Sequence, residues 1–254
     1  MNWKNKLDTF IENFEHKADV VGILVCGSFV TGNPTAHSDL DVHIILDETV
    51  NYRERGNKII EGLLIEYFAN PPCQIRSYFK DDYTNIDLMS QTQFATGEIL
   101  FDKTGIVAKL KKEAMAMMAS KFQDITPANH GLIKYGIWDM MDDLQDLFES
   151  DRADFDFVYY SNLNQLIATY MQQIRQPYNK KTILGTIISD AVREKYLLDE
   201  LPNEQVKKLI HTCITAKDKK IRLNSYELLT LFTLDLMGGF EIDGFKFKSE
   251  VSIT

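Results

Sequence analysis

The stretch VVGILVCGSFVTGNPTAHSDLDVHIIL, residues 20–46, constrains the fold more than any other part of the sequence. It contains two runs as apolar as core strands, joined by a turn rich in Thr, Gly and Asn, and the second run carries Asp39 and Asp41. Side chains two residues apart in a strand point to the same face, so Asp39, Asp41 and His43 should share one face while the apolar residues between them anchor the other. Strand formation alone does not explain the two aspartates.

The first 120 residues alternate short apolar runs with amphipathic stretches, which is typical of a sheet covered by helices. The segment NWKNKLDTFIENF has apolar residues at helical spacing and predicts a helix near the N-terminus. Strands are predicted at residues 20–26, 39–46, 62–68 and 98–102, and helices at 72–80 and 106–119.

The second half of the chain keeps helical spacing almost throughout. The pair Thr126-Pro127 predicts the start of a helical region, and the apolar spacing continues to about residue 237. The segment GGFEIDGFKFKSE then alternates apolar residues around an Asp-Gly pair, which predicts a small hairpin.

We therefore predict an α+β fold with two domains. Residues 1–120 should form one domain with a mixed β-sheet and helices. Residues 121–254 should form a helical bundle that ends in a short C-terminal hairpin.

Composition limits the class of protein. The 254 residues contain no apolar run of about 18 residues and no secretory pattern at the N-terminus, so we expect a cytoplasmic protein without a membrane span. Three cysteines without paired spacing argue against a disulfide framework and a zinc site. The formal charge of -9 disfavours nucleic acid as a partner, and cationic partners fit better.

Paired carboxylates on a strand repel each other unless a cation lies between them. Oxygen-rich ligands of this kind suit Mg²⁺, and the turn after Gly27 and Ser28 offers backbone amides for a phosphate. Taken alone, Asp39 and Asp41 would more often mark a solvated strand edge. The Gly-Ser pair, with Ser28 eleven residues before Asp39, instead favours a site for a metal ion and a nucleotide.

The segment GSFVTGNPTAHSDLDV resembles the nucleotidyltransferase superfamily that includes DNA polymerase beta and the aminoglycoside nucleotidyltransferases. The resemblance is strong over residues 20–46, moderate over the rest of the first 120 residues and general in the helical half. It implies transfer of a nucleoside monophosphate, by family habit AMP from ATP, to a hydroxyl group through two Mg²⁺ ions. It also implies a third carboxylate on a neighbouring strand.

Glu66, in the apolar segment GLLIEYFANPP, is the candidate for that third carboxylate, as a metal ligand or base. An edge-strand residue is the alternative for Glu66, and the weaker candidates are Asp47, Glu48 and Glu61. The resemblance gives Asp39 and Asp41 the role of metal ligands. It also implies that Gly27 and Ser28 bind the triphosphate and that Lys180 or Lys181 contacts it as a cationic partner. Both lysines are equally well explained as solvated surface residues.

Residues 139–156 are the part of the sequence that bears on the kind of acceptor. They contain eight acidic side chains and one basic side chain. Asp139 and Asp143 should lie on a polar helix face that either is solvated or attracts a polycationic acceptor such as an aminoglycoside, which would make the protein an antibiotic-resistance enzyme. Three functions remain open: a small-molecule nucleotidyltransferase, an enzyme that modifies a protein or tRNA in a toxin–antitoxin or regulatory system, and a non-catalytic nucleotide-binding module. A homodimer also remains open.

Overall fold

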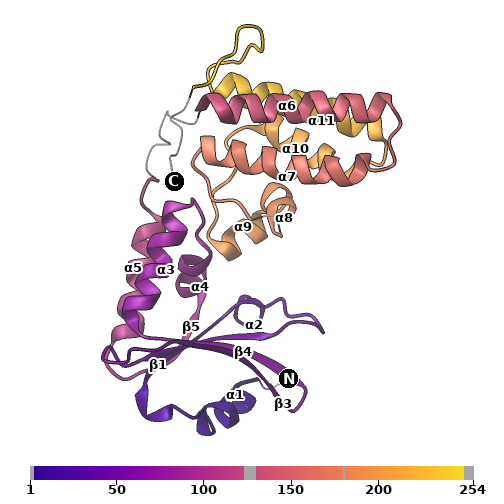
Figure 1. The fold of residues 1–254 in the computed structure, drawn as a ribbon. Helices are drawn as coiled ribbons and strands as arrows, with labels where there is room; N and C mark the ends of the chain where they lie inside the picture. Colours follow the sequence, from indigo (N-terminus) through magenta and orange to yellow (C-terminus); the bar gives the residue numbers. More distant parts are fainter. Residues whose placement is uncertain (1–2, 123–129, 180, 249–254) are drawn as a thin grey trace, which may run out of the picture. The chain divides into compact units, whose positions relative to one another are not determined.

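The computed structural model describes residues 3–122, 130–179 and 181–248 (Figure 1). The chain divides into two compact units, which are described separately. The first, the N-terminal unit, comprises Met1–Phe122 and Ala191–Leu198, and the second, the helical unit, comprises Gln123–Asp190 and Asp199–Thr254. The predicted start of the helical region at Thr126-Pro127 lies outside the described residues.

A five-stranded mixed sheet forms the centre of the N-terminal unit, in the order β3-β4-β2-β1-β5. Strand β1 is antiparallel to β2 and β5, β2 is parallel to β4, and β3 is antiparallel to β4. This arrangement confirms the predicted α+β class with a mixed sheet. The strands are β1 (Val20–Cys26), β2 (Leu40–Leu46), β3 (Glu54–Ile60), β4 (Leu63–Asn70) and β5 (Glu98–Asp102).

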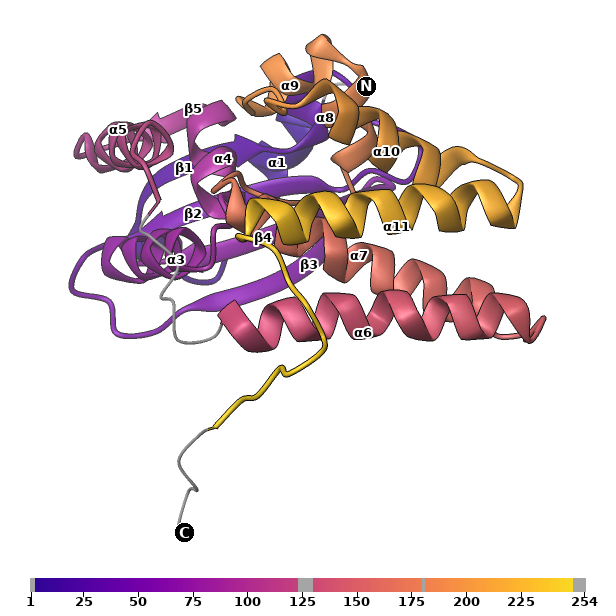
Figure 2. The same cartoon turned by 90° about the horizontal axis from the view of Figure 1, so that it is seen from above.

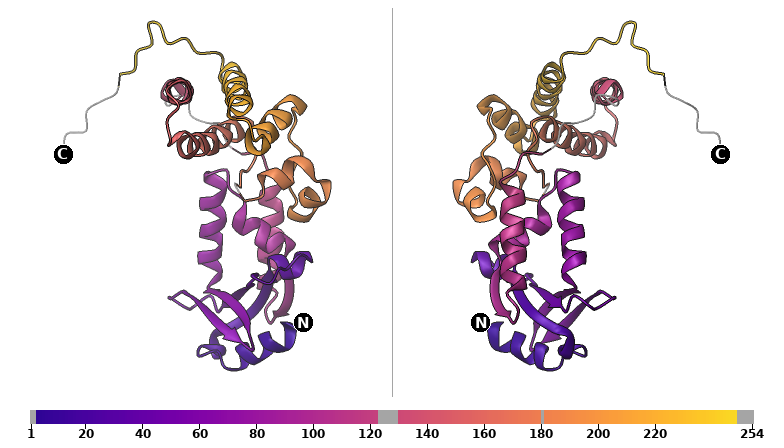
Figure 3. Two further views of the ribbon diagram at one scale, coloured as in Figure 1. Left: turned by 90° about the vertical axis from the view of Figure 1, so that its right-hand side faces the viewer. Right: turned by 90° about the vertical axis from the view of Figure 1, so that its left-hand side faces the viewer.

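Helices cover both faces of this sheet (Figures 1 and 3). On one face, α1 packs Leu7 and Phe10 against alternate residues of β2, including Val42 and Ile44. On the other face, α3, α4 and α5 cover a second apolar cluster that contains Ile45. Because β2 is central and buried on both faces, a charged side chain on it is costly unless it has a partner. The helices are α1 (Trp3–Glu12), α3 (Pro72–Thr84), α4 (Met89–Thr96) and α5 (Ile106–Met118), with a 3-10 helix η1 (Lys17–Asp19).

The predicted strands and helices of the first half agree with the structure to within a few residues, but η1 and three other elements were not predicted. Strand β3 is an edge strand with mostly exposed, charged residues and lacks an apolar alternation. Helix α4 is short and has almost no amphipathic pattern, and α2 (Ser28–Thr31) is a single turn. Elements without an apolar face give no periodic signal in the sequence.

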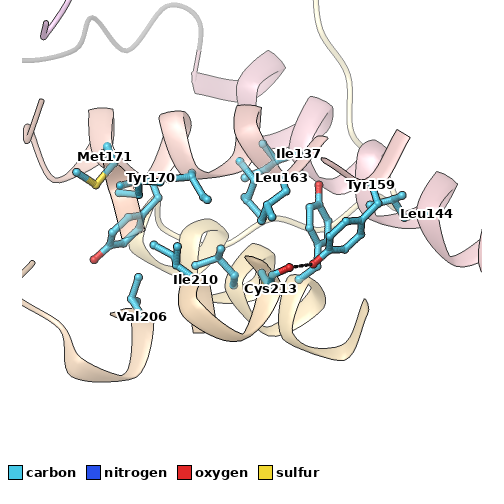
Figure 4. Close-up of a cluster of buried hydrophobic side chains, with 14 of the residues drawn as sticks. Ile137, Leu144, Tyr159, Leu163, Tyr170, Met171, Val206, Ile210 and Cys213 are labelled. Carbon is cyan, nitrogen blue, oxygen red and sulfur yellow. Dashed lines mark hydrogen bonds between the residues drawn. The ribbon is translucent and has the colours of Figure 1, made fainter. Parts of the chain in front are cut away.

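Helices α6, α7, α10 and α11 make up most of the helical unit (Figure 2). They bury one large apolar cluster between them (Figure 4). The helical spacing predicted for this half of the chain is confirmed on α6, where Ile137, Leu144 and Leu147 are buried. Tyr159 of α7 donates its buried hydroxyl to the carbonyl of Cys213 on α10, at 3.0 Å. The helices are α6 (His130–Glu149), α7 (Phe155–Gln173), α10 (Glu204–Thr215) and α11 (Lys219–Leu236), with the shorter α8 (Ile183–Ile188). Helix α9 (Asp190–Tyr196) belongs, except for its first residue, to the N-terminal unit.

The predicted C-terminal hairpin is not formed in the described residues, because positions 238–248 contain a turn but no strand (Figure 3). An isolated pair of short strands is at best marginally stable in water. The aromatic residues instead pack on α6: the Phe245 ring stacks on Tyr135 with centroids 5.4 Å apart, and Phe240 contacts Trp138. Phe240 and Phe245 therefore contact a helix and not a partner strand.

Two further expectations concern the class of protein. Among the described residues, no helix is both long enough and apolar enough to span a membrane. The cysteines are free: Cys26 and Cys213 are buried, and Cys73 is exposed.

Candidate metal and nucleotide site

Three carboxylates meet at one end of β2. Oxygen atoms of Asp39, Asp41 and Glu66 all lie within 4.8 Å of one another, and all three side chains are partly buried. We refer to these three residues as the carboxylate cluster. The structure thus brings together the three acids that the sequence analysis selected.

The register of the sheet creates this cluster. In the parallel pair β2–β4, Asp41 lies directly beside Glu66, so both side chains project from the same face. Asp39 was predicted to lie inside the strand, but β2 begins at Leu40 and Asp39 ends the preceding turn. It still reaches the cluster because it is only two residues from Asp41.

The turn after β1 lies against the same carboxylates. Cys26, the last residue of β1, pairs with Asp41 in the antiparallel register, and Gly27 follows with a φ of 74°. A Cβ atom on Gly27 would lie 2.1 Å from the Oδ2 atom of Asp41. Only glycine combines this conformation with such a close approach. Ser28 then begins α2 and is half-buried.

Asp41 has the most perturbed electrostatics of the cluster. Burial, followed by the neighbouring charges of Asp39 and then Glu66, raises its pKa to about 6. The same burial and the two aspartates also raise the pKa of the Cys26 thiol, so Cys26 stays protonated. The cluster therefore holds more negative charge than its surroundings stabilise.

A divalent cation fits this arrangement. The cluster offers only carboxylate oxygens at close spacing, which is the ligand chemistry that Mg²⁺ prefers. A cation would offset the repulsion that raises the pKa of Asp41. The cluster can therefore hold a metal ion next to the turn at Gly27 and Ser28.

Arg55 on β3 is a neighbour of the cluster that the sequence analysis missed. Its Nη2 and Nε atoms donate to Oε1 of Glu66 at 2.6 and 3.2 Å. The charged, Gly-containing segment ERGNKII reads as a loop, and only the pairing of β3 with β4 places Arg55 there. Its positive charge was the one signal in the sequence.

His43 shares the face of Asp41 but is buried beneath aromatic rings. It stacks on Phe68 with centroids 5.3 Å apart, contacts Phe94, and forms a hydrogen bond of 3.2 Å with Gln93. Burial lowers the pKa of His43 to about 4, so the ring is neutral at physiological pH. His43 therefore belongs to the packed interior next to the carboxylate cluster and is neutral.

The other predicted residues lie elsewhere. Asp47 follows the opposite end of β2, where its carboxylate accepts hydrogen bonds from Thr49. Lys180 lies outside the described residues, and Lys181 is exposed in the helical unit, with its amide bonded to Asn179. Their assignment to the triphosphate stays a prediction.

The two predicted acceptor residues lie on α6 in the helical unit. Asp139 is half-buried and Asp143 is exposed. A hydrogen bond from Tyr135 to Asp139, together with the charges of Asp139 and Asp143, raises the pKa of the Tyr135 hydroxyl. Among the described residues, neither aspartate forms an ion pair with a lysine or arginine.

Comparisons with known proteins agree with this site. Residues 7–94, which contain the carboxylate cluster and the Gly27–Ser28 turn, match the family model described as a nucleotidyltransferase domain. This match confirms the resemblance predicted from residues 20–46.

A solved structure is also similar. The crystal structure of a nucleotidyltransferase-like protein from Exiguobacterium sibiricum 255-15 matches at 13% sequence identity and a TM-score of 0.43, over 93% of this chain and 77% of that chain. No curated protein matches the chain.

Proposed function

Because the N-terminal unit carries a nucleotidyltransferase domain, the domain of enzymes that transfer phosphorus-containing groups, we propose that the protein transfers a nucleoside monophosphate to a hydroxyl group of a small molecule. The donor is a nucleoside triphosphate, and ATP is the expected one. The observation that carries this proposal is the carboxylate cluster, which lies against the Gly27 turn within the matched residues.

Asp39, Asp41 and Glu66 would hold two Mg²⁺ ions. When bound, such ions activate the acceptor hydroxyl and offset the charge on the reacting phosphate. Asp41, with its pKa raised to about 6, must be ionised to serve as a ligand, so this role requires a pH above that value or a bound cation. Glu66 is paired with Arg55 and stays on the same face.

Gly27 and Ser28 would bind the phosphates of the donor. Gly27, with its positive φ, follows the end of β1 and lies against Asp41, and Ser28 begins the short helix α2 directly after it. Backbone amides in such turns form concave sites for anions. This arrangement supports a triphosphate held next to the cluster, where positioning provides most of the catalysis.

A cationic acceptor, such as an aminoglycoside, is the proposed partner of the helical unit. The support is the exposed acidic face of α6, where Asp142, Asp143 and Asp146 follow the half-buried Asp139. Negative charges gathered on one face of a helix raise the local concentration of a cationic ligand. Modification of such an acceptor would make the protein an antibiotic-resistance enzyme.

The test is a transfer assay with purified protein, Mg²⁺, each of the four labelled nucleoside triphosphates, and a panel of aminoglycosides and lincosamides. We expect one acceptor to gain the mass of one nucleoside monophosphate. The same reaction with EDTA, or with the Asp41→Asn variant, should give no product. Transfer to a protein or tRNA from a cell extract, with no product from the panel, would replace the small-molecule acceptor. Nucleotide binding without transfer to any acceptor would refute the enzymatic function.

A further inference from the structure

Arg55 is bound to one of the three carboxylates in a defined geometry. Its direct partner across the β3–β4 pair is Phe68, whereas Glu66 is paired with Asn57. The guanidinium therefore reaches diagonally along the strand to Glu66, and both donating atoms, Nη2 and Nε, share the single oxygen Oε1. The second oxygen of Glu66, Oε2, accepts no hydrogen bond from the described residues.

The guanidinium also has a support beneath it. Its Cζ atom lies 4.8 Å from the centroid of the Phe68 ring, and Phe68 in turn stacks on the buried His43. The Arg55 side chain is 68% exposed, whereas that of Glu66 is only 19% exposed. Two simultaneous contacts, one to a carboxylate and one to a ring, restrict Arg55 more than an ordinary surface ion pair.

Glu66 needs such a partner because of its neighbours. Asp39 and Asp41 lie within 4.8 Å and repel it, and within the described residues neither aspartate has a lysine or arginine partner of its own. A flexible glutamate would lower its energy by turning away from them toward solvent. The Arg55 contact is compatible with the cluster, since the three carboxylates are together in the same structure that contains the ion pair.

We propose that Arg55 is a positioning residue for Glu66: it holds one carboxylate oxygen so that the other is directed at the divalent cation of the cluster. This inference depends on the proposed function, since it takes Glu66 as a metal ligand. Hydrogen-bond partners of metal ligands commonly fix ligand orientation in this way. Arg55 itself does not contact the cation.

The alternative is that Arg55 and Glu66 form an ordinary surface ion pair that only stabilises the edge strand. In that case, removing Arg55 would not change the geometry of the metal ligands. Removing a positive charge beside a cation site would then leave the affinity unchanged or increase it by Coulomb's law. A positioning role predicts weaker metal binding when Arg55 is removed. The sign of the change therefore separates the two.

The experiment is a titration of the full chain with Mn²⁺ in the absence of nucleotide, with free Mn²⁺ measured by electron paramagnetic resonance. We expect Arg55→Ala to weaken Mn²⁺ binding about tenfold. Arg55→Lys, which keeps the charge but not the planar fork, should recover only part of this loss. Melting temperatures of each variant would verify that the variants are folded.

Arg53→Ala is the matched control. Arg53 precedes the same strand, but its Nη1 atom donates to the Tyr78 hydroxyl at 2.7 Å and not to a carboxylate. Its removal deletes the same charge two residues away and should change Mn²⁺ affinity by less than about twofold.

Three results would overturn the inference: unchanged or tighter Mn²⁺ binding by Arg55→Ala, an equal loss in Arg53→Ala, or no Mn²⁺ binding by the wild-type protein. The proposed function is tested separately by the transfer assay. Weakened Mn²⁺ binding in Arg55→Ala with no transfer to any acceptor would support the role of Arg55 and refute the enzymatic function.

Discussion

The two units use partly buried charge in opposite ways. In the N-terminal unit, the carboxylate cluster gathers three like charges, and only Glu66 has a cationic partner among the described residues. In the helical unit, Arg222 is 6% exposed and paired with Asp156 at 2.5 Å, and it also donates to the Tyr160 hydroxyl at 2.7 Å. The like charges of the carboxylate cluster raise the free energy of the folded state, whereas the charge of Arg222 is neutralised by its direct partner Asp156.

This difference separates charge kept for function from charge kept for structure. A like-charge cluster opposes folding, so its presence requires a ligand that the cluster binds. A paired charge needs no ligand, because its partner is already in the fold. The predictions below test this division, beginning with the largest expected effect.

Asp41→Asn should lower the rate of nucleotide transfer at least about a thousandfold, because an amide oxygen is a poor substitute for a charged metal ligand. Asp39→Asn should have a similar effect. Both variants should fold, since neither aspartate has a cationic partner to lose among the described residues. Steady-state rates at saturating Mg²⁺ would measure the loss, and circular dichroism the fold.

Near wild-type turnover in either variant would mean that the cluster is not the metal site. A variant that is both inactive and unfolded would instead place the aspartate with the structural charges.

Asp156→Ala should show the reverse behaviour. It leaves the buried guanidinium of Arg222 without its carboxylate, which we expect to lower the free energy of unfolding by about 2–4 kcal/mol. Urea denaturation would measure this change. The matched control is Asp154→Ala, which breaks an exposed pair with Arg152 and should cost less than about 1 kcal/mol. Equal effects of the two substitutions would contradict a structural role for the buried pair.

The sequence revealed the functional charges better than the structural ones. Asp41 and Glu66 each interrupt an apolar strand and Asp39 directly precedes one, and a charge in or next to an apolar run needs an explanation that can be sought without a structure. The distance between them could not be predicted from the residues alone, because it depends on the parallel register of β2 with β4. The resemblance to a known family supplied that information.

The remaining features depend on contacts that no periodicity encodes. Arg55 reaches Glu66 across an exposed edge strand, and Arg222 reaches Asp156 across 66 positions of the chain. In each case the sequence shows a charge but not its partner. The hairpin predicted at residues 238–250 is not formed in the described part, 238–248, for a related reason, since Phe240 and Phe245 pack on α6.

The pH dependence of stability offers a smaller but direct test of the cluster. The pKa of Asp41 is about 6 in the folded protein and about 3.9 in an unfolded chain. A raised pKa stabilises the fold below pH 4, and this contribution is lost as the pH rises through 6. In EDTA, Asp41→Asn and the wild type should therefore be equally stable at pH 4, whereas at pH 7 the variant should be more stable by about 1–2 kcal/mol after allowance for solvent screening.

Urea unfolding of both proteins between pH 4 and 7 would measure this difference. Saturating Mg²⁺ at pH 7 should remove the advantage of the variant, because the cation stabilises the ionised wild-type cluster. A difference that does not change with pH would show that Asp41 is not destabilised by its neighbours.

The acidic face of α6 gives the smallest expected effect, and it tests which kind of charge that helix carries. Asp139 and Asp143 are like charges without ion-pair partners among the described residues, as in the cluster, but exposure to solvent lowers the cost of leaving them unpaired. If they attract a cationic acceptor, neutralising both as Asp139→Asn with Asp143→Asn should raise the KM of the acceptor about three- to tenfold. The KM of the triphosphate should change little, and the effect on the acceptor should grow at low ionic strength because salt screens long-range attraction.

The paired substitution Asp151→Asn with Asp154→Asn removes the same charge outside α6 and is the control. Equal changes in both KM values, or no change in either, would identify the acidic face as solvated surface and remove the main argument for a cationic acceptor.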